Sequence, residues 1–195
     1  MDNVSTVTLK DDYLRVRGQS LEICNTLAAE DTVVQSMPDV SPSKWHLAHV
    51  TWFFERMVLE EFSPGYQRYN EDFDFLFNSY YYTVGQMHAR PSRGLLSRPT
   101  LAEVVAYRSH VDETMQSLLE TVDEQQVLER VILGLNPEQQ HQELMLTDIK
   151  HVFSCNPLQP AVRPDLLIPE AMPAPAYSYI NGASGIHEVG ATGLG

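Results

Sequence analysis

The chain has 195 residues and a mass of 22.1 kDa, which suits one domain with an extension. Hydrophobic residues make up 43 %, enough for a core, while the net charge of −13 disfavours nucleic acid and anionic membranes as partners. No membrane-spanning apolar run, signal-peptide pattern or disulfide framework is present (the two cysteines are Cys24 and Cys155), so we expect a cytoplasmic protein.

The first two predicted helices are separated by a short break. The first runs over about residues 9–35, where apolar residues recur at helical spacing, and Ser36–Pro38 ends it. The second begins at Ser41–Pro42, because serine is a good N-cap and proline fits the first helical position. It ends near Phe62. Its apolar face carries Trp45, Ala48, His49, Trp52 and Phe53.

The third and fourth predicted helices also have clear start signals. Thr100 and Glu103 have the spacing of a capping box at the start of the third. The fourth begins at Asn136–Pro137, again a cap followed by proline, and Gly134 is expected to close the helix before it. The apolar face of this last helix carries His141, Leu144, Met145, Asp148, Ile149 and Val152.

A segment of about 37 residues, rich in aromatic and acidic side chains, connects the second and third helices. A short helix is predicted within it over residues 73–82. A connection of this length is usually functional or a crossover. Four amphipathic helices with one long crossover indicate an all-α fold, a four-helix bundle.

Composition changes after Asn156. Six of the twelve prolines lie between Pro157 and Pro175, and five of the ten glycines lie between Gly182 and Gly195. We therefore divide the chain into a helical domain (1–156), a proline-rich linker (157–176) and the start of a second, truncated domain (177–195).

Two histidines are candidate metal ligands. His49 and His141 lie on the apolar faces of separate helices, so both are expected to point toward the core. A single inward histidine is usually a hydrogen-bonded core residue, but helix bundles build metal sites from facing side chains, and imidazole suits iron, zinc, copper and nickel. Both interpretations stay open at this point. His46, three positions before His49, lies on the same face or at its edge.

Two arginines precede the third helix. Arg90 and Arg93 lie close together in an aromatic-rich part of an acidic chain. A guanidinium holds a carboxylate through two hydrogen bonds, so the pair is a candidate site for an acidic ligand. The alternative is that they form salt bridges with nearby acids such as Glu71, Asp72 or Asp74.

Several long strings resemble one enzyme family. They are SPSKWHLAHVTWFFE (41–55), FNSYY (77–81), RPSRGLLSRPT (90–100), EQQHQEL (138–144) and LTDIKH (146–151). Over about residues 10–160 the chain resembles the N-terminal, DinB-like helical domain of the ergothioneine-biosynthesis sulfoxide synthases, also called hercynine oxygenases. Residues 177–190 resemble the entry into that family's second domain, which is similar to formylglycine-generating enzymes.

The resemblance implies a non-haem Fe(II) enzyme. Members of the family use dioxygen to join a cysteine or γ-glutamylcysteine thiol to hercynine, which yields a sulfoxide. Three histidines hold the iron, and His49 and His141 match two of them. Arg90 and Arg93 match an arginine pair that binds substrate carboxylate. No catalytic residue is assigned in this chain, because the family's catalytic tyrosine lies in the second domain.

Two departures from the family pattern affect the expected function. The position of the remaining histidine ligand is Pro137, which has no metal-binding side chain. Glu138 is the candidate replacement, since two histidines and one carboxylate are a common iron-binding set. Most of the second domain is absent from this sequence, so we expect the chain to be inactive alone and name a separate second-domain polypeptide as a candidate partner.

Two other functions remain open. One is an inactive, truncated bundle that has lost its metal. The other is a stand-alone, metal-dependent thiol transferase of the wider DinB-like superfamily, whose members also use three-histidine sites in helical bundles.

Overall fold

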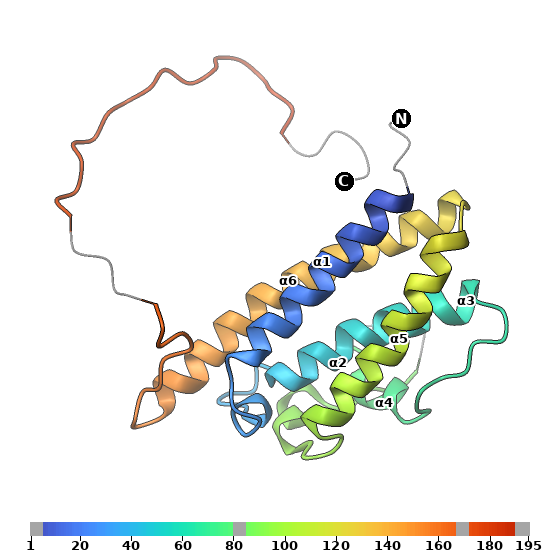
Figure 1. Cartoon of the computed structure of the whole chain (residues 1–195). Coiled ribbons are helices and arrows are strands. Elements are labelled where there is room, and N and C mark those ends of the chain that lie inside the picture. The colour runs from blue at the N-terminus through green and yellow to red at the C-terminus, as the bar shows by residue number, and fades with distance from the viewer. Residues whose placement is uncertain (1–5, 80–84, 167–171, 190–195) are drawn as a thin grey trace.

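The computed structural model describes residues 6–79, 85–166 and 172–189, and these ranges contain helices and no strand (Figure 1). The all-α prediction is therefore confirmed at the level of fold class. The long helices are α1 (Thr6–Asn25), α2 (Ser43–Phe54), α5 (Leu101–Thr121) and α6 (Gln125–Cys155). The short elements are η1 (Asp31–Val33), η2 (Glu55–Leu59), α3 (Glu60–Phe62), α4 (Phe73–Phe77) and η3 (Arg90–Leu95).

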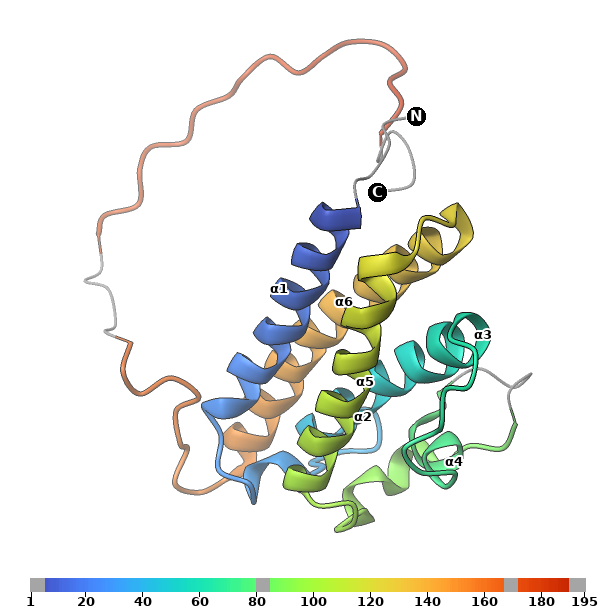
Figure 2. The same cartoon turned by 45° about the vertical axis from the view of Figure 1, so that its right-hand side comes forward.

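The long helices pack around α2. Helices α1 and α6 lie side by side in both views, and α2 packs against α5 and α6 (Figures 1 and 2). Every residue of α2 from Ser43 to Phe54 is buried, the polar ones included. Because a buried polar group needs a partner, the polar side chains of α2 must find their hydrogen-bond partners within the protein. None of the helices in the described ranges combines the length and apolar character needed to cross a bilayer.

The start of α2 differs from the prediction. The helix begins at Ser43, and Pro42 occupies the N-cap position without a side-chain cap. Ser41 is instead used in tertiary contacts: its N–H donates to Asp148 Oδ2 (2.8 Å), and its hydroxyl accepts from Arg93 Nη1 (2.9 Å). The end of the helical segment is confirmed, because a π-helical turn, η2, and α3 carry it on to Phe62.

The first helix is shorter than predicted, and the third begins as predicted. Helix α1 ends at Asn25, and the chain then turns into η1 rather than continuing to residue 35. Asp31 Oδ2 accepts from the Ala28 N–H (2.9 Å), a local bond that competes with helix. At α5, the Thr100 hydroxyl and the Glu103 carboxylate cap each other's backbone N–H, which confirms the predicted capping box.

The predicted break before the fourth helix is wrong. Helix α6 is continuous from Gln125 to Cys155 and contains Pro137. Gly134 does not end a helix there. A Cβ at Gly134 would lie 2.7 Å from ring carbons of Phe53 and Phe54, so glycine lets α6 approach α2 closely. Tertiary packing thus explains Gly134, which the sequence rule for helix C-termini assigns to a helix end.

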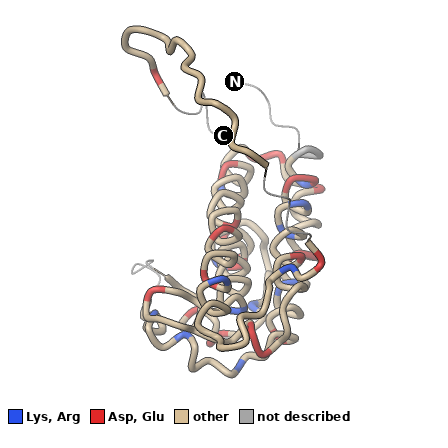
Figure 3. Tube along the Cα trace, turned by 90° about the vertical axis from the view of Figure 1, so that its left-hand side faces the viewer, with Lys and Arg blue, Asp and Glu red and all other residues tan. Residues whose placement is uncertain are grey.

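The crossover contains short helical elements, and the segment after α6 contains none in the described residues. Helix α4 confirms a short helix from Phe73, but it ends at Phe77 and residues 78 and 79 are not helical; residues 80–82 of that prediction lie outside the described ranges. After α6 the described residues form neither helix nor strand, and the chain leaves the helices (Figure 1). Tyr177 and Tyr179 are fully exposed there. Figure 3 shows charged residues mainly on the helices and their connections. In the described sequence after α6, Arg163 and Asp165 form an ion pair, and Glu188 is the one Asp, Glu, Lys or Arg within 172–189.

Candidate metal centre

Three histidines meet where α2 faces α6. His46 and His49 are buried on α2, and His141 is half-buried on α6. The ring centroids are 5.0 Å apart for His46 and His141 and 4.8 Å apart for His49 and His141. The structure therefore brings together the two histidines singled out in the sequence. It also adds His46, whose place three residues before His49 was the available signal.

A line of hydrogen bonds connects His141 to an aspartate. His141 Nδ1 lies 2.7 Å from His46 Nδ1, and His46 Nε2 lies 3.0 Å from Asp148 Oδ2. Helix α6 supplies both ends of this line, since His141 and Asp148 are seven residues, about two turns, apart. The sequence placed Asp148 on the apolar face of this helix without giving it a role.

His49 is held by the helix α4 region and by two tryptophans. Its Nδ1 donates to the carbonyl of Phe77 (2.6 Å). Its ring stacks on Trp45 (centroids 4.8 Å apart, planes 10° apart) and on Trp52 (5.9 Å, 16°). These contacts fix both the position and the plane of the imidazole.

The environment keeps the histidines neutral. Burial lowers the pKa of His49 to about 4 and, together with the nearby His49, His46, Arg93 and Arg90, lowers the pKa of His141 to about 2. Burial also lowers the pKa of His46, although the hydrogen bond to Asp148 opposes that shift. A neutral imidazole carries one N–H and one lone pair, and only the lone pair can bind a metal.

The two arginines lie beside this cluster. Arg93 is buried, with its guanidinium carbon 3.3 Å from the centroid of the Trp45 ring, and it donates to Ser41 Oγ (2.9 Å) and Ser79 Oγ (3.0 Å). Arg90 donates to the carbonyl of Asp39. The Trp45 ring thus contacts both the Arg93 guanidinium and the stacked His49 ring.

Glu138 lies in a separate buried cluster. One carboxylate oxygen accepts from Arg17 Nη1 (3.0 Å), and the other accepts from Ser20 Oγ (2.7 Å) and from Arg108 Nη2. Burial alone would raise the pKa of Glu138, but the guanidiniums of Arg108 and Arg17 outweigh it and lower the pKa to about 2. Both oxygens are thus engaged by groups of α1 and α5, and the structure does not bring this carboxylate into the histidine cluster.

Comparison with known proteins identifies the family. The DinB superfamily model matches residues 12–152. The chain belongs to the DinB superfamily. The matched range begins in α1 and ends within the last turn of α6, so it contains every residue of the histidine cluster. No curated protein matches the chain.

Two imidazole nitrogens of this DinB-superfamily domain are candidate donor atoms for a metal ion. Nε2 of His49 and Nε2 of His141 make no hydrogen bond with the described part of the chain, whereas the Nδ1 atom of each ring is engaged. The position one turn before His141 is Pro137, which offers no donor atom. Accordingly, the described residues contain no group of three or more His, Cys, Asp or Glu side chains placed to hold a metal ion.

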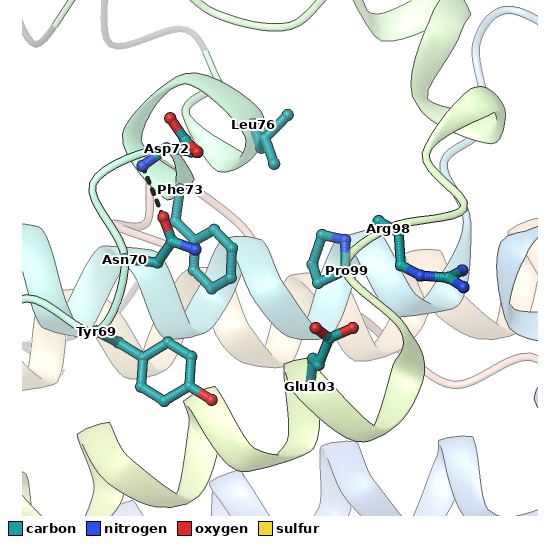
Figure 4. A pocket seen from close by; sticks show the side chains of 8 residues that line it. All are labelled: Tyr69, Asn70, Asp72, Phe73, Leu76, Arg98, Pro99 and Glu103. Carbon is teal, nitrogen blue, oxygen red and sulfur yellow. Dashed lines mark hydrogen bonds between the residues drawn. The ribbon is translucent and has the colours of Figure 1, made fainter.

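A pocket of about 250 Å³ lies elsewhere on the DinB domain, between the α4 region and the start of α5 (Figure 4). Arg98 and Glu103 border it on one side, and Tyr69 and Phe73 on the other. Glu103 is already used in the capping box of α5. None of the histidines or arginines predicted to form the site lines this pocket, so we do not assign it to the metal centre.

Proposed function

We propose that this chain is the helical metal-binding domain of a hercynine-oxygenase-type protein. In this proposal His49 and His141 hold a divalent ion, Fe(II), through two imidazoles. The observation that carries it is the pair of neutral imidazoles with engaged Nδ1 atoms and Nε2 atoms left without a partner in the described residues. When bound, the ion supplies open coordination positions at which a thiol and dioxygen are brought together.

The surrounding side chains support binding and orientation of an anionic substrate. Arg93 and Arg90 add positive charge close enough to the cluster to lower the pKa of His141. Stacking between Trp45 and both Arg93 and His49 holds that charge at a fixed place relative to the imidazoles. We propose that this face receives a carboxylate of the thiol or of hercynine.

The proposal includes the domain organisation. A four-helix bundle built from α1, α2, α5 and α6 forms the domain over 1–156, followed by a linker (157–176) and the beginning of a second domain (177–195). We expect no hercynine-dependent oxygen consumption by the chain alone. Such activity without added protein would contradict the need for a second domain.

Anaerobic Fe(II) titration tests the metal site. We expect the parent chain to bind one Fe(II) weakly and His141→Ala to lose that binding. Pro137→His should bind more tightly, because residue 137 lies one turn before His141 on the same helix face. His187→Ala, in the exposed C-terminal segment, is the matched loss of an imidazole and should bind as the parent does.

The same titration distinguishes the proposal from its main alternative. If the parent binds no Fe(II) while Pro137→His does, the chain is an inactive bundle that has lost its metal. If His141→Ala binds as well as the parent, the ion is held elsewhere and the proposed site is wrong.

A further inference from the structure

The line from Asp148 through His46 to His141 connects a proposed ligand, His141, to two side chains that the two-ligand site does not by itself require. His46 and Asp148 are 2 % and 7 % exposed, respectively, so neither interacts mainly with water. The carboxylate oxygen facing His46 also accepts from the Ser41 N–H (2.8 Å), which holds it in place. His46 touches His141 at one ring nitrogen and Asp148 at the other.

The carboxylate determines the direction of the hydrogen bonds. Asp148 Oδ2 can only accept, so His46 Nε2 must carry the proton that joins them. In a neutral His46 the other ring nitrogen, Nδ1, then has a lone pair and must accept. His141 Nδ1 therefore donates to it, and the remaining nitrogen of a neutral His141, Nε2, is left with its lone pair.

The reverse direction is disfavoured by the surroundings. If His46 Nδ1 donated to His141, His46 would carry protons on both nitrogens and be a cation. His46 is 2 % exposed, and burial disfavours the charged form of an imidazole. Arg93 and Arg90, both nearby, also oppose a positive charge at His46.

His49 reaches the same state by a different contact. Its Nδ1 faces the Phe77 carbonyl, which can only accept, so Nδ1 carries the proton and Nε2 has the lone pair. Two imidazoles on different helices thus have the same tautomer, one set by a backbone carbonyl and the other by a buried side-chain pair. A free neutral histidine in water prefers the opposite tautomer, with the proton on Nε2, so both contacts act against the intrinsic preference.

We propose that Asp148 and His46 are positioning residues, which hold His141 in the Nδ1–H tautomer so that its Nε2 lone pair can bind the metal ion. The inference rests on the proposed metal site, although the tautomer itself can be tested without metal. Partners of this kind behind a metal-binding histidine typically change metal affinity by about 10–100-fold when removed. We expect an effect of that size here.

Two substitutions at His46 separate the relay from simple packing. His46→Leu removes both ring nitrogens. His46→Asn keeps an oxygen near the position of Nδ1, which can still accept from His141. ¹⁵N NMR of histidine side chains reports the tautomer of His141 in the metal-free chain, and titration with Co(II), followed by visible absorption, reports affinity. His187→Leu is the control for loss of an unrelated imidazole.

The expected result is an Nδ1–H tautomer for His141 in the parent and in His46→Asn, with the proton on Nε2 in His46→Leu. Co(II) affinity should fall at least about tenfold in His46→Leu and be largely restored in His46→Asn. Asp148→Ala tests the same relay from its other end if His46→Leu does not fold. Its His141 should lose the single Nδ1–H tautomer.

Four outcomes distinguish the relay from its alternatives. An Nε2–H tautomer of His141 in the parent, or an unchanged tautomer in both His46→Leu and Asp148→Ala, overturns the relay. A changed tautomer with an unchanged Co(II) affinity overturns its role toward the metal. A changed tautomer in a chain that binds no Co(II) supports the relay and overturns the proposed metal site instead.

Discussion

Replacement of Glu138 by glutamine should destabilise the protein strongly while leaving metal binding intact. Glu138 is 0 % exposed, and its partners Arg17 and Arg108 are 2 % and 0 % exposed. The substitution keeps the size and some hydrogen bonds but removes the negative charge between two buried guanidiniums. Arg17 would retain Asp112 (2.7 Å) as its remaining acidic partner. Breaking a buried ion pair in this way typically costs about 3–5 kcal/mol.

The pKa of Glu138 gives a second estimate of the same quantity. The pKa of Glu138 falls from its ordinary 4.5 to about 2 on folding. At about 1.36 kcal/mol per pKa unit, this shift contributes roughly 3.4 kcal/mol to the free energy of unfolding at neutral pH. Because the pKa is lowered in the folded state, this stabilisation is complete above about pH 4.5 and is lost as the pH falls toward 2. The two estimates agree on about 3–4 kcal/mol at pH 7.

Urea unfolding followed by circular dichroism measures the effect. We expect Glu138→Gln to lower the free energy of unfolding by about 3–4 kcal/mol at pH 7 and by much less near pH 3. Glu129→Gln, an exposed carboxylate on the same helix, should change it by less than about 0.5 kcal/mol. A Glu138→Gln variant within about 1 kcal/mol of the parent at pH 7 would refute this account of the cluster. A loss of Fe(II) binding in a folded variant would instead make Glu138 a ligand.

Three further predictions test the packing, the histidines and the C-terminal segment. Gly134→Ala should lower the free energy of unfolding by about 1–3 kcal/mol, because its Cβ would lie 2.7 Å from the Phe53 and Phe54 rings. Gly18→Ala, with nothing within 4 Å, should raise it by up to about 1 kcal/mol; equal losses in the two variants would contradict the close approach. The pKa of His49 falls to about 4 in the folded state, so the free energy of unfolding measured with urea should decrease as the pH drops from about 6.5 toward 4. A free energy that stays constant over that range would contradict the buried, neutral state of His49. Removal of residues 157–195 should leave the helical circular dichroism of the bundle unchanged, since the described residues after α6 are mostly exposed, and a large loss would count against the domain boundary.

The sequence rules for helix ends predicted the structure correctly where the residues involved lie within one helical turn. The Thr100–Glu103 capping box depends on side chains three residues apart, and both of its hydrogen bonds form as predicted. The same rules failed at Ser41 and at Asn136–Pro137. There the sequence has a good helix start, but Ser41 bonds to Asp148 and Arg93, and packing carries α6 through Pro137. A local signal is weak compared with the burial of a long apolar face.

The candidate site was predictable in part. Helical spacing placed His49 and His141 on inward faces, and the structure brings their rings to 4.8 Å. The sequence could not predict that His46 bridges His141 and Asp148, because that contact depends on the register between α2 and α6. Nor could it show that Glu138, three residues before His141, turns to Arg17 and Arg108.

The sequence by itself determined the helical class and the inward faces of its helices, because periodicity and capping act over a few residues. It also determined that Pro137 cannot supply a ligand, since that follows from the side chain alone. Only the tertiary structure decided which buried polar groups meet. The partners of a buried polar group depend on how helices far apart in the chain are aligned. On α6, Glu138 therefore contacts Arg17 of an ion-pair cluster, while His141, three residues later, contacts His46.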